Sequence, residues 1–173
     1  MSAAQESLFK VWLQEHRGIF VKVARSYAQG EAEAADLQQE MFYQLWLSLP
    51  RFGGHAKPST WIYRVCLNTA LAWRRGAQRR EVKMEPGVDL AQLSAGTASP
   101  AETVGEQELM GELFAAIHAM PATERALVLL LLDGMSYREI AEVTGLTENH
   151  VGVALTRARK RLASLMKGVI DEL

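Results

Sequence analysis

The sequence contains a single cysteine, Cys66, which excludes an internal disulfide. It has no CxxC pair and no Cys/His cluster at the spacing of zinc ligands, so we expect neither a metal nor a cofactor. Its longest apolar run, at residues 126–132, is too short to cross a bilayer, and its first residues lack the pattern of a signal peptide. These absences predict a reduced, cytoplasmic protein without membrane insertion.

Signals of strands and of catalysis are also missing. The sequence has no Asn-Gly hairpin turn, and its apolar residues recur mostly at helical spacing. Its four histidines are scattered, and no Ser/His/Asp or Cys/His arrangement has a supporting context. Cys66, midway in an amphipathic helix, is interpreted as a buried small apolar group rather than a nucleophile. We therefore expect an all-α fold with no catalytic residue.

Charge is distributed unevenly along the chain, although the formal net charge is only −1. Residues 64–83 carry six basic groups and one acid, and residues 157–167 carry five basic groups and no acid. Between them, residues 84–124 contain seven acids and no Lys or Arg. A polyanion responds to local charge, so this pattern favours a nucleic-acid partner. A basic helix end that merely complements the helix dipole remains an alternative for the first segment.

Residues 82–106 are predicted to be a flexible acidic linker. They contain Pro86 and Pro100, several Gly and Ser residues and little apolar mass. The linker divides the chain into two small helical domains, residues 1–81 and 107–173.

Two helices are predicted in the first domain around a loop rich in Gly, His and Lys. The helix before the loop has a buried stripe that recurs every four residues, and Pro50 ends it. The helix after the loop is expected to begin with Ser59 or Thr60 as its N-cap and to run to Gly76. The stripe of the earlier helix consists of Leu37, Met41, Leu45 and Leu49.

The second domain has the layout of a helix-turn-helix, whose second helix enters the major groove of DNA. An amphipathic helix that Pro121 stops is followed by a nearly all-apolar central helix. Ser136 and Glu139 then fit a capping box, Gly145 ends that short helix, and Thr147 caps the last one. The stripe of the amphipathic helix consists of Leu109, Leu113, Ile117 and Met120.

The last helix has two distinct sides. Its Asn and Arg residues can read bases, and its Val and Thr methyl groups can contact a thymine methyl. An ordinary helical hairpin with a solvated basic end is the alternative. The inward stripe consists of Val151, Leu155, Ala158, Leu162 and Leu165, and the DNA-facing side consists of Asn149, Gly152, Val153, Thr156, Arg157 and Lys160.

Gly152 leaves that DNA-facing side without a side chain at its centre. We therefore expect close backbone approach to DNA there, and Gly152→Arg is expected to raise DNA affinity broadly. Arg159, Lys160 and Arg161 are predicted to hold phosphates.

The chain as a whole resembles the extracytoplasmic-function sigma factors, the smallest class of the bacterial sigma-70 family. The resemblance covers nearly the full length and rests on several motifs in matching order: DLQQEMFYQLW, TWIYRVCLN, a basic helix end, an acidic linker and MPATERALVLLLLDGMSYREIAEVTGLTENHVGVALTRARKRL. It implies two helical domains, called sigma-two and sigma-four. It also implies a protein that binds core RNA polymerase and starts transcription at a stress- or signal-responsive set of promoters.

The resemblance assigns roles to residues of the first domain. The loop around Gly54 and Ala56 resembles one that captures a flipped base of the minus-ten promoter element, whereas Trp61 and Tyr63 are better explained by core packing. Contacts to the clamp helices of the largest polymerase subunit are implied for Asp36, Gln39, Glu40 and Tyr43, with a solvated helix face as the alternative. Contacts to minus-ten DNA are implied for His55, Lys57, Asn68, Trp73, Arg74 and Arg75.

In the second domain the last helix resembles the reader of the minus-thirty-five element, and a contact with the flap of the second-largest polymerase subunit is implied. The linker resembles a segment that imitates nucleic acid inside the polymerase, with a plain spacer as the alternative. An anti-sigma protein is implied as a further partner. The sequence departs from the family at Gly152, where Lys or Arg is frequent, at Ala72, where Asp is frequent, and at Pro58 and Ser59.

A rival interpretation is a helix-turn-helix regulator that acts without core polymerase. It explains residues 109–167 but leaves DLQQEMFYQLW and the following loop unexplained.

Overall fold

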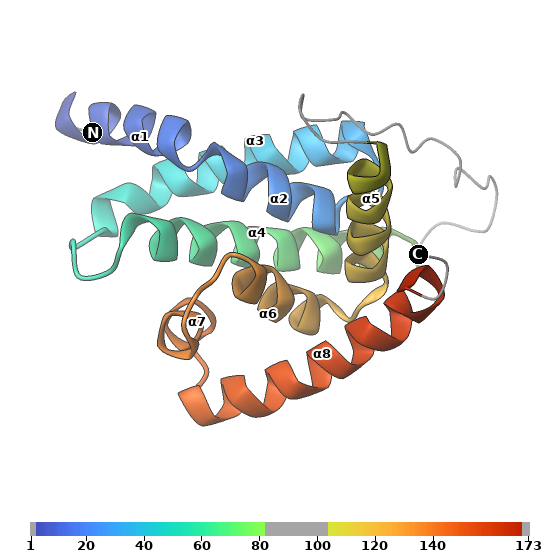
Figure 1. Ribbon diagram of the computed structural model, residues 1–173. Coiled ribbons are helices and arrows are strands. Elements are labelled where there is room, and N and C mark those ends of the chain that lie inside the picture. Colours follow the sequence, from blue (N-terminus) through green and yellow to red (C-terminus); the bar gives the residue numbers. More distant parts are fainter. Residues whose placement is uncertain (1–2, 82–103, 171–173) are drawn as a thin grey trace. The chain divides into compact units, whose positions relative to one another are not determined.

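The computed structural model describes residues 3–81 and 104–170, and within these ranges every regular element is a helix (Figure 1). The predicted all-α fold is confirmed. The chain divides into two compact units, Met1–Leu93 and Ser94–Leu173, each described by itself below. Most of the predicted linker, residues 82–103, lies outside the described residues. The domain boundaries remain predictions.

The first unit is built on three helices, α2, α3 and α4, that pack against one another (Figure 1). The predicted stripe of α3 is confirmed, because Leu37, Met41, Leu45 and Leu49 are all buried. Cys66 of α4 is also fully buried, as expected. The elements of this unit are α1 (Ala3–Glu15), α2 (Arg17–Tyr27), α3 (Glu31–Ser48), a 3-10 turn (Leu49–Arg51) and α4 (Pro58–Glu81).

Both ends of α4 differ from the sequence expectation. The helix begins at Pro58, and the backbone N–H of Trp61 donates to the carbonyl of Lys57, so Ser59 and Thr60 lie inside the first turn instead of capping it. Proline suits this position because the first helical N–H needs no partner within the helix. The helix also continues through Gly76 to Glu81, since one helical glycine costs only about 1 kcal/mol.

The second unit places its most apolar helix at the centre, as predicted. Residues Arg125 to Leu130 of α6 are buried in a continuous run, and α6 packs against α8. The elements of this unit are α5 (Val104–Ala119), α6 (Ala122–Leu132), α7 (Tyr137–Thr144) and α8 (Glu148–Ile170).

Two members of the predicted stripes are exposed instead of buried. Leu109 of α5 is 40% exposed and Leu165 of α8 is 43% exposed, whereas Met166 is buried. At about 100° per residue, Met166 lies within roughly 20° of Leu155 around α8, while Leu165 lies about 80° away. The inward stripe therefore continues to Met166.

The predicted helix ends around the helix-turn-helix are confirmed. Ser136 Oγ accepts from the backbone N–H of Glu139, whose carboxylate accepts from the backbone N–H of Ser136. Gly145 ends α7 with a φ of 75°, which favours glycine. Thr147 Oγ1 accepts from the backbone N–H of His150 in the first turn of α8.

Ser136→Ala is expected to lower the stability of the second unit by about 1 kcal/mol, the usual cost of losing an N-cap. Urea unfolding followed by circular dichroism measures the change. Ser164→Ala, the same substitution at an exposed position of α8, is the control and should have little effect. Equal midpoints for the two variants would show that the capping box contributes nothing.

Candidate functional site

One side of α3 presents polar groups at helical spacing. Asp36, Gln39 and Tyr43 are exposed, and Tyr43 is 55% exposed. Glu40 is half-buried, and its Oε1 accepts from Gln44 Nε2 at 2.8 Å. The sequence analysis missed Leu47, which is 46% exposed and continues this side one turn beyond Tyr43. Its four-residue spacing from Tyr43 was the available signal. The α3 face, defined as Asp36, Gln39, Glu40, Tyr43 and Leu47, thus joins acidic, amide and apolar groups.

The loop between α3 and α4 is compact at its tip. Gly54 has a φ of 75°, and the ring of His55 lies over Gly53, where an added Cβ would be 3.0 Å from His55 Cδ2. Both His55 and Lys57 are exposed. The loop therefore presents an imidazole and an ammonium group at the start of α4.

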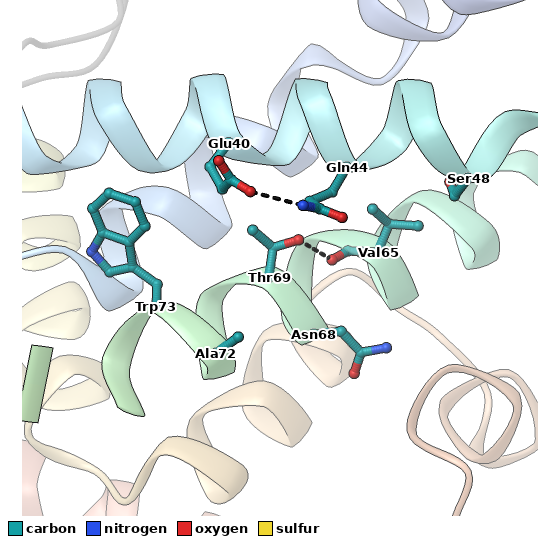
Figure 2. Close-up of a pocket in the computed structure, with 8 residues that line it drawn as sticks. All are labelled: Glu40, Gln44, Ser48, Val65, Asn68, Thr69, Ala72 and Trp73. Atoms are coloured by element: carbon teal, nitrogen blue, oxygen red, sulfur yellow. Dashed lines mark hydrogen bonds between the residues drawn. The ribbon is translucent and has the colours of Figure 1, made fainter. Parts of the chain in front are cut away.

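An open pocket of about 470 Å³ lies between α3 and α4, with Trp73 at one end and Ser48 at the other (Figure 2). It brings Glu40, a predicted polymerase contact, together with Asn68 and Trp73, two predicted DNA contacts. Sequence reasoning missed Gln44 in its wall, although Gln44 is one turn after Glu40. The complete lining is Glu40, Gln44, Ser48, Val65, Asn68, Thr69, Ala72 and Trp73.

The indole of Trp73 is fixed by a hydrogen bond across the helix pair. Its Nε1 donates to Glu33 Oε1 at 2.7 Å, and Glu33 Oε2 accepts from the backbone N–H of Gln29. Trp73 is half-buried, so part of its ring remains accessible while its N–H is engaged. Of the two basic groups that follow, Arg74 is half-buried and Arg75 is exposed.

Core packing holds the two other aromatic residues of α4. Tyr63 is buried, and Trp61 contacts the Phe52 ring edge-on at 5.5 Å and donates to Ser48 Oγ. This agrees with the core role expected for them.

The predicted DNA-facing side of α8 lies opposite its buried stripe. Val151, Leu155 and Ala158 are fully buried. The hydroxyl of Thr156 donates to the carbonyl of Gly152 at 2.9 Å, so its proton is engaged within the helix. The exposed predicted residues are Asn149, Val153, Thr156, Arg157 and Lys160, and Gly152 is half-exposed.

The structure shows two contacts on this side that sequence reasoning missed. At Gly152, an added Cβ would lie 3.5 Å from Cε2 of Tyr137, an ordinary van der Waals contact. Arg161, expected to hold phosphate, pairs with Glu124 of α6, with Nε 2.7 Å from Oε2, and its side chain remains 53% exposed. Both partners are distant in sequence, so helical periodicity gave no signal for them.

Within residues 3–81 and 104–170, no group of three His, Cys, Asp or Glu side chains could hold a metal ion. None of the helices described is long and apolar enough to cross a membrane.

Two family models match the chain in the order of the two units. Sigma-70 region 2 matches residues 4–80, and sigma-70 region 4 matches residues 110–162. The chain belongs to the sigma-70 family. The helix-turn-helix regulator is not favoured, because the region 2 match accounts for the helices that this rival leaves unexplained.

Individual relatives narrow the class. The chain is 28% identical over 145 residues to the ECF RNA polymerase sigma-E factor of Escherichia coli, covering 80% of this chain and 76% of the relative. It is 24% identical over 157 residues to the RNA polymerase sigma factor NccH of Alcaligenes xylosoxydans xylosoxydans, covering 90% and 84%. This sigma factor is thus of the extracytoplasmic-function class, an alternative sigma factor for transcription initiation.

Solved structures share the fold. The sigma factor RpoE from Bartonella quintana, solved in complex with the anti-sigma factor NepR, superposes with a TM-score of 0.73 at 22% identity, covering 92% of this chain and 96% of that one. CnrH, solved in complex with the cytosolic domain of CnrY, gives a TM-score of 0.62 at 22% identity, covering 94% and 90%.

Proposed function

We propose that the α3 face is the surface that binds core RNA polymerase, through the clamp helices of the largest subunit. The observation that carries this proposal is the exposure of Tyr43 and Leu47 beside Asp36 and Gln39. Exposed aromatic and apolar groups next to polar ones are typical of protein-binding patches. The second unit then supplies the contact with the flap of the second-largest subunit.

We propose that the loop and the α3–α4 pocket bind the melted minus-ten element. Flipping a base out of the stack costs a few kcal/mol, which a pocket with a stacking surface can offset. The part-exposed ring of Trp73 and the amide of Asn68 provide such a surface in the pocket. The cations that hold the strand backbone beside it are Lys57, Arg74 and Arg75, with His55 at the loop tip.

We propose that the exposed side of α8 reads the minus-thirty-five element. Asn149 and Arg157 offer bidentate hydrogen bonds to adenine and guanine, and the methyl groups of Val153 and Thr156 can contact thymine. Lys160 is the phosphate contact at the edge of this surface.

We also propose how the protein is regulated and where in the cell it acts. The Bartonella quintana sigma factor RpoE was solved in complex with the anti-sigma factor NepR, which supports a cognate anti-sigma protein for this chain. We place the protein in the cytoplasm, where its polymerase and promoters are, and assign it a binding function without catalysis or cofactor at a signal-responsive set of promoters.

Asp36→Arg is expected to weaken assembly with core polymerase roughly tenfold to hundredfold, because charge reversal within a buried interface costs about 1–3 kcal/mol. Gln39→Ala should weaken it less. Titrating fluorescently labelled core enzyme with each purified variant gives the affinities. Duplex DNA binding by the variants alone should change little, since the α3 face is not the DNA surface.

Glu31→Arg is the matched control for this experiment. It makes the same charge change at an exposed position of α3, about 140° around the helix from Asp36. Equal weakening by Glu31→Arg and Asp36→Arg would mean that net charge, and not the α3 face, governs assembly. A wild-type chain that ignores core enzyme would reject the proposal altogether.

A further inference from the structure

Two indole hydrogen bonds join α3 to α4, one near each end of the α3–α4 pocket (Figure 2). Near one end, Trp61 Nε1 donates to Ser48 Oγ at 3.2 Å. Near the other, Trp73 Nε1 donates to Glu33 Oε1 at 2.7 Å. The second bond is the shorter one, as expected for a carboxylate acceptor, and such bonds are about twice as strong as those between neutral groups. The orientation of the Trp73 ring is therefore fixed more firmly than packing alone would fix it.

The carboxylate that accepts from Trp73 is itself held in place. Glu33 is the third residue of α3, and its Oε2 accepts from the backbone N–H of Gln29 at 2.6 Å. A carboxylate in the first turn of a helix is also stabilised by the helix dipole. Its two oxygens thus have different partners, one in the turn before α3 and the other in α4. Glu33 is half-buried, so this connection is partly shielded from water.

The bond to Glu33 determines which part of Trp73 is available to a ligand. An indole has one N–H donor and no hydrogen-bond acceptor, and Glu33 occupies that donor. In Figure 2 the ring nitrogen points away from the other labelled residues, so the carbon side of the ring faces the pocket. A ring without a free donor can stack on any base, because every base has a π face. It cannot select one base by hydrogen bonding.

We propose that Glu33 is a positioning residue for Trp73, which holds the indole as a stacking surface for an unpaired base and withholds its N–H from the bases. The inference rests on the proposed binding of the melted minus-ten strand in the α3–α4 pocket. Two neighbouring groups of the pocket then have different roles. Trp73 contributes to strand opening, whereas the exposed amide of Asn68 contributes to the choice of sequence.

The first test needs no DNA. In the full chain labelled with nitrogen-15, the indole N–H signal of Trp73 is assigned with Trp73→Phe. In Glu33→Ala this signal should move to higher field and exchange faster with solvent, because its acceptor is gone, while the signals of the other three tryptophans stay in place. Glu31→Ala, which removes the same charge from the same turn of α3, is the control and should leave all four signals in place. An unmoved Trp73 signal in Glu33→Ala would overturn the inference.

The second test measures strand opening by holoenzyme assembled from the full chain and core polymerase. Templates randomised over the promoter region are transcribed, and the sequences of those that yield transcripts define the preferred promoter. Permanganate reactivity of its minus-ten thymines then reports opening, at a temperature at which the wild-type complex is half open. Glu33→Ala should lower the equilibrium constant of opening about threefold to tenfold, because a misoriented ring loses part of its stacking contribution.

A double-variant cycle separates positioning from a purely structural role. Trp73→Phe keeps an aromatic ring but has no N–H to donate to Glu33. Glu33→Ala in this background should therefore cause little further loss of opening. A structural role of Glu33, through its bond to Gln29, would instead cause the same loss in both backgrounds. Trp73→Phe should also keep the preferred minus-ten sequence, because the indole N–H does not read a base.

The charge of Glu33 acts against the expected result. Removing an acid near DNA favours binding by electrostatics alone, so Glu33→Ala would increase opening if only charge mattered. Glu31→Ala makes the same charge change without removing the acceptor of the indole, and it should open the promoter at least as well as the wild type. Unchanged or increased opening in Glu33→Ala would overturn the inference, as would an altered preferred sequence in Trp73→Phe.

Trp73→Ala and Asn68→Ala distinguish a failure of the proposed function. If both leave the opening and the preferred minus-ten sequence unchanged, the α3–α4 pocket does not bind the melted strand. If they impair opening or alter the sequence while Glu33→Ala has no effect, only the positioning role of Glu33 is rejected.

Discussion

Arg125→Met is expected to lower the free energy of unfolding of the second unit by about 3 kcal/mol and to leave the first unit unchanged. Arg125 is only 3% exposed. Its Nη2 donates to the carbonyl of His118 and, at 3.0 Å, to the carbonyl of Met120. These carbonyls lie at the C-terminal end of α5, where no further helical turn supplies N–H partners. The guanidinium of Arg125, a residue of α6, therefore supplies hydrogen-bond donors to the carbonyl groups at the C-terminal end of α5.

The expected loss of stability follows from the hydrogen bonds that methionine cannot make. Methionine fills much of the space of the arginine stem but donates no hydrogen bond, so two carbonyls lose a charged donor. Each buried acceptor left without a partner costs about 1–3 kcal/mol. A unit of this size is stable by only roughly 3–10 kcal/mol. The substitution thus removes a large fraction of the stability of the second unit.

The positions of the tryptophans allow the unfolding of the first unit to be followed separately. All four tryptophans, Trp12, Trp46, Trp61 and Trp73, belong to the first unit, so tryptophan fluorescence follows that unit alone. Circular dichroism follows the helices of both units. In urea, Arg125→Met should shift part of the dichroism transition to lower concentration and leave the fluorescence transition in place.

Arg138→Met is the matched control for Arg125→Met. Arg138 is an exposed arginine of the same unit that pairs with Glu142 at the surface, with Nε 3.6 Å from Oε1. Surface pairs of this kind contribute at most about 1 kcal/mol. If Arg138→Met and Arg125→Met shift the dichroism transition equally, the buried hydrogen bonds contribute nothing of their own.

Structural features that depend on residues close together in the sequence could be predicted from it. The capping box of Ser136 and Glu139, the left-handed Gly145 and the cap at Thr147 each depend on residues within four positions. The same holds for which side of α3 or α8 is buried, because helical periodicity fixes it. Local chemistry therefore predicted most helix ends and the exposure of most candidate residues.

Features that join distant residues could not be predicted in this way. Trp73 and Glu33 are 40 residues apart, and Arg161 and Glu124 are 37 apart. Whether a polar side chain is free to contact DNA or instead contacts a neighbouring helix depends on how the helices pack. The spacing of residues along one helix carries no information about that packing. This is why the position of Tyr137 beside Gly152 was not predicted.

Cys66 is expected to resist thiol reagents in the folded protein. It is fully buried in the first unit, and burial raises the pKa of its thiol, while the thiolate is the reactive form. Labelling therefore requires the first unit to open. For a unit stable by about 5 kcal/mol, labelling should be three to four orders of magnitude slower than in denaturant. Because Cys66 is the only cysteine, the labelling rate reports on this unit alone. Fast labelling without denaturant would contradict the burial.

The same thiol should make the first unit sensitive to alkali. An unfolded cysteine ionises near about pH 8.5, whereas buried Cys66 stays protonated well above that, so its stabilising contribution is complete below that pH and is lost as pH rises. The free energy of unfolding should then fall by about 1.4 kcal/mol per pH unit above about pH 9. Burial also raises the pKa of Tyr63, but that contribution is lost only above about pH 10. Between these values Cys66→Ala, which has no thiol, should remove the slope in fluorescence-detected unfolding. A slope that persists in Cys66→Ala would assign the alkaline sensitivity to another group.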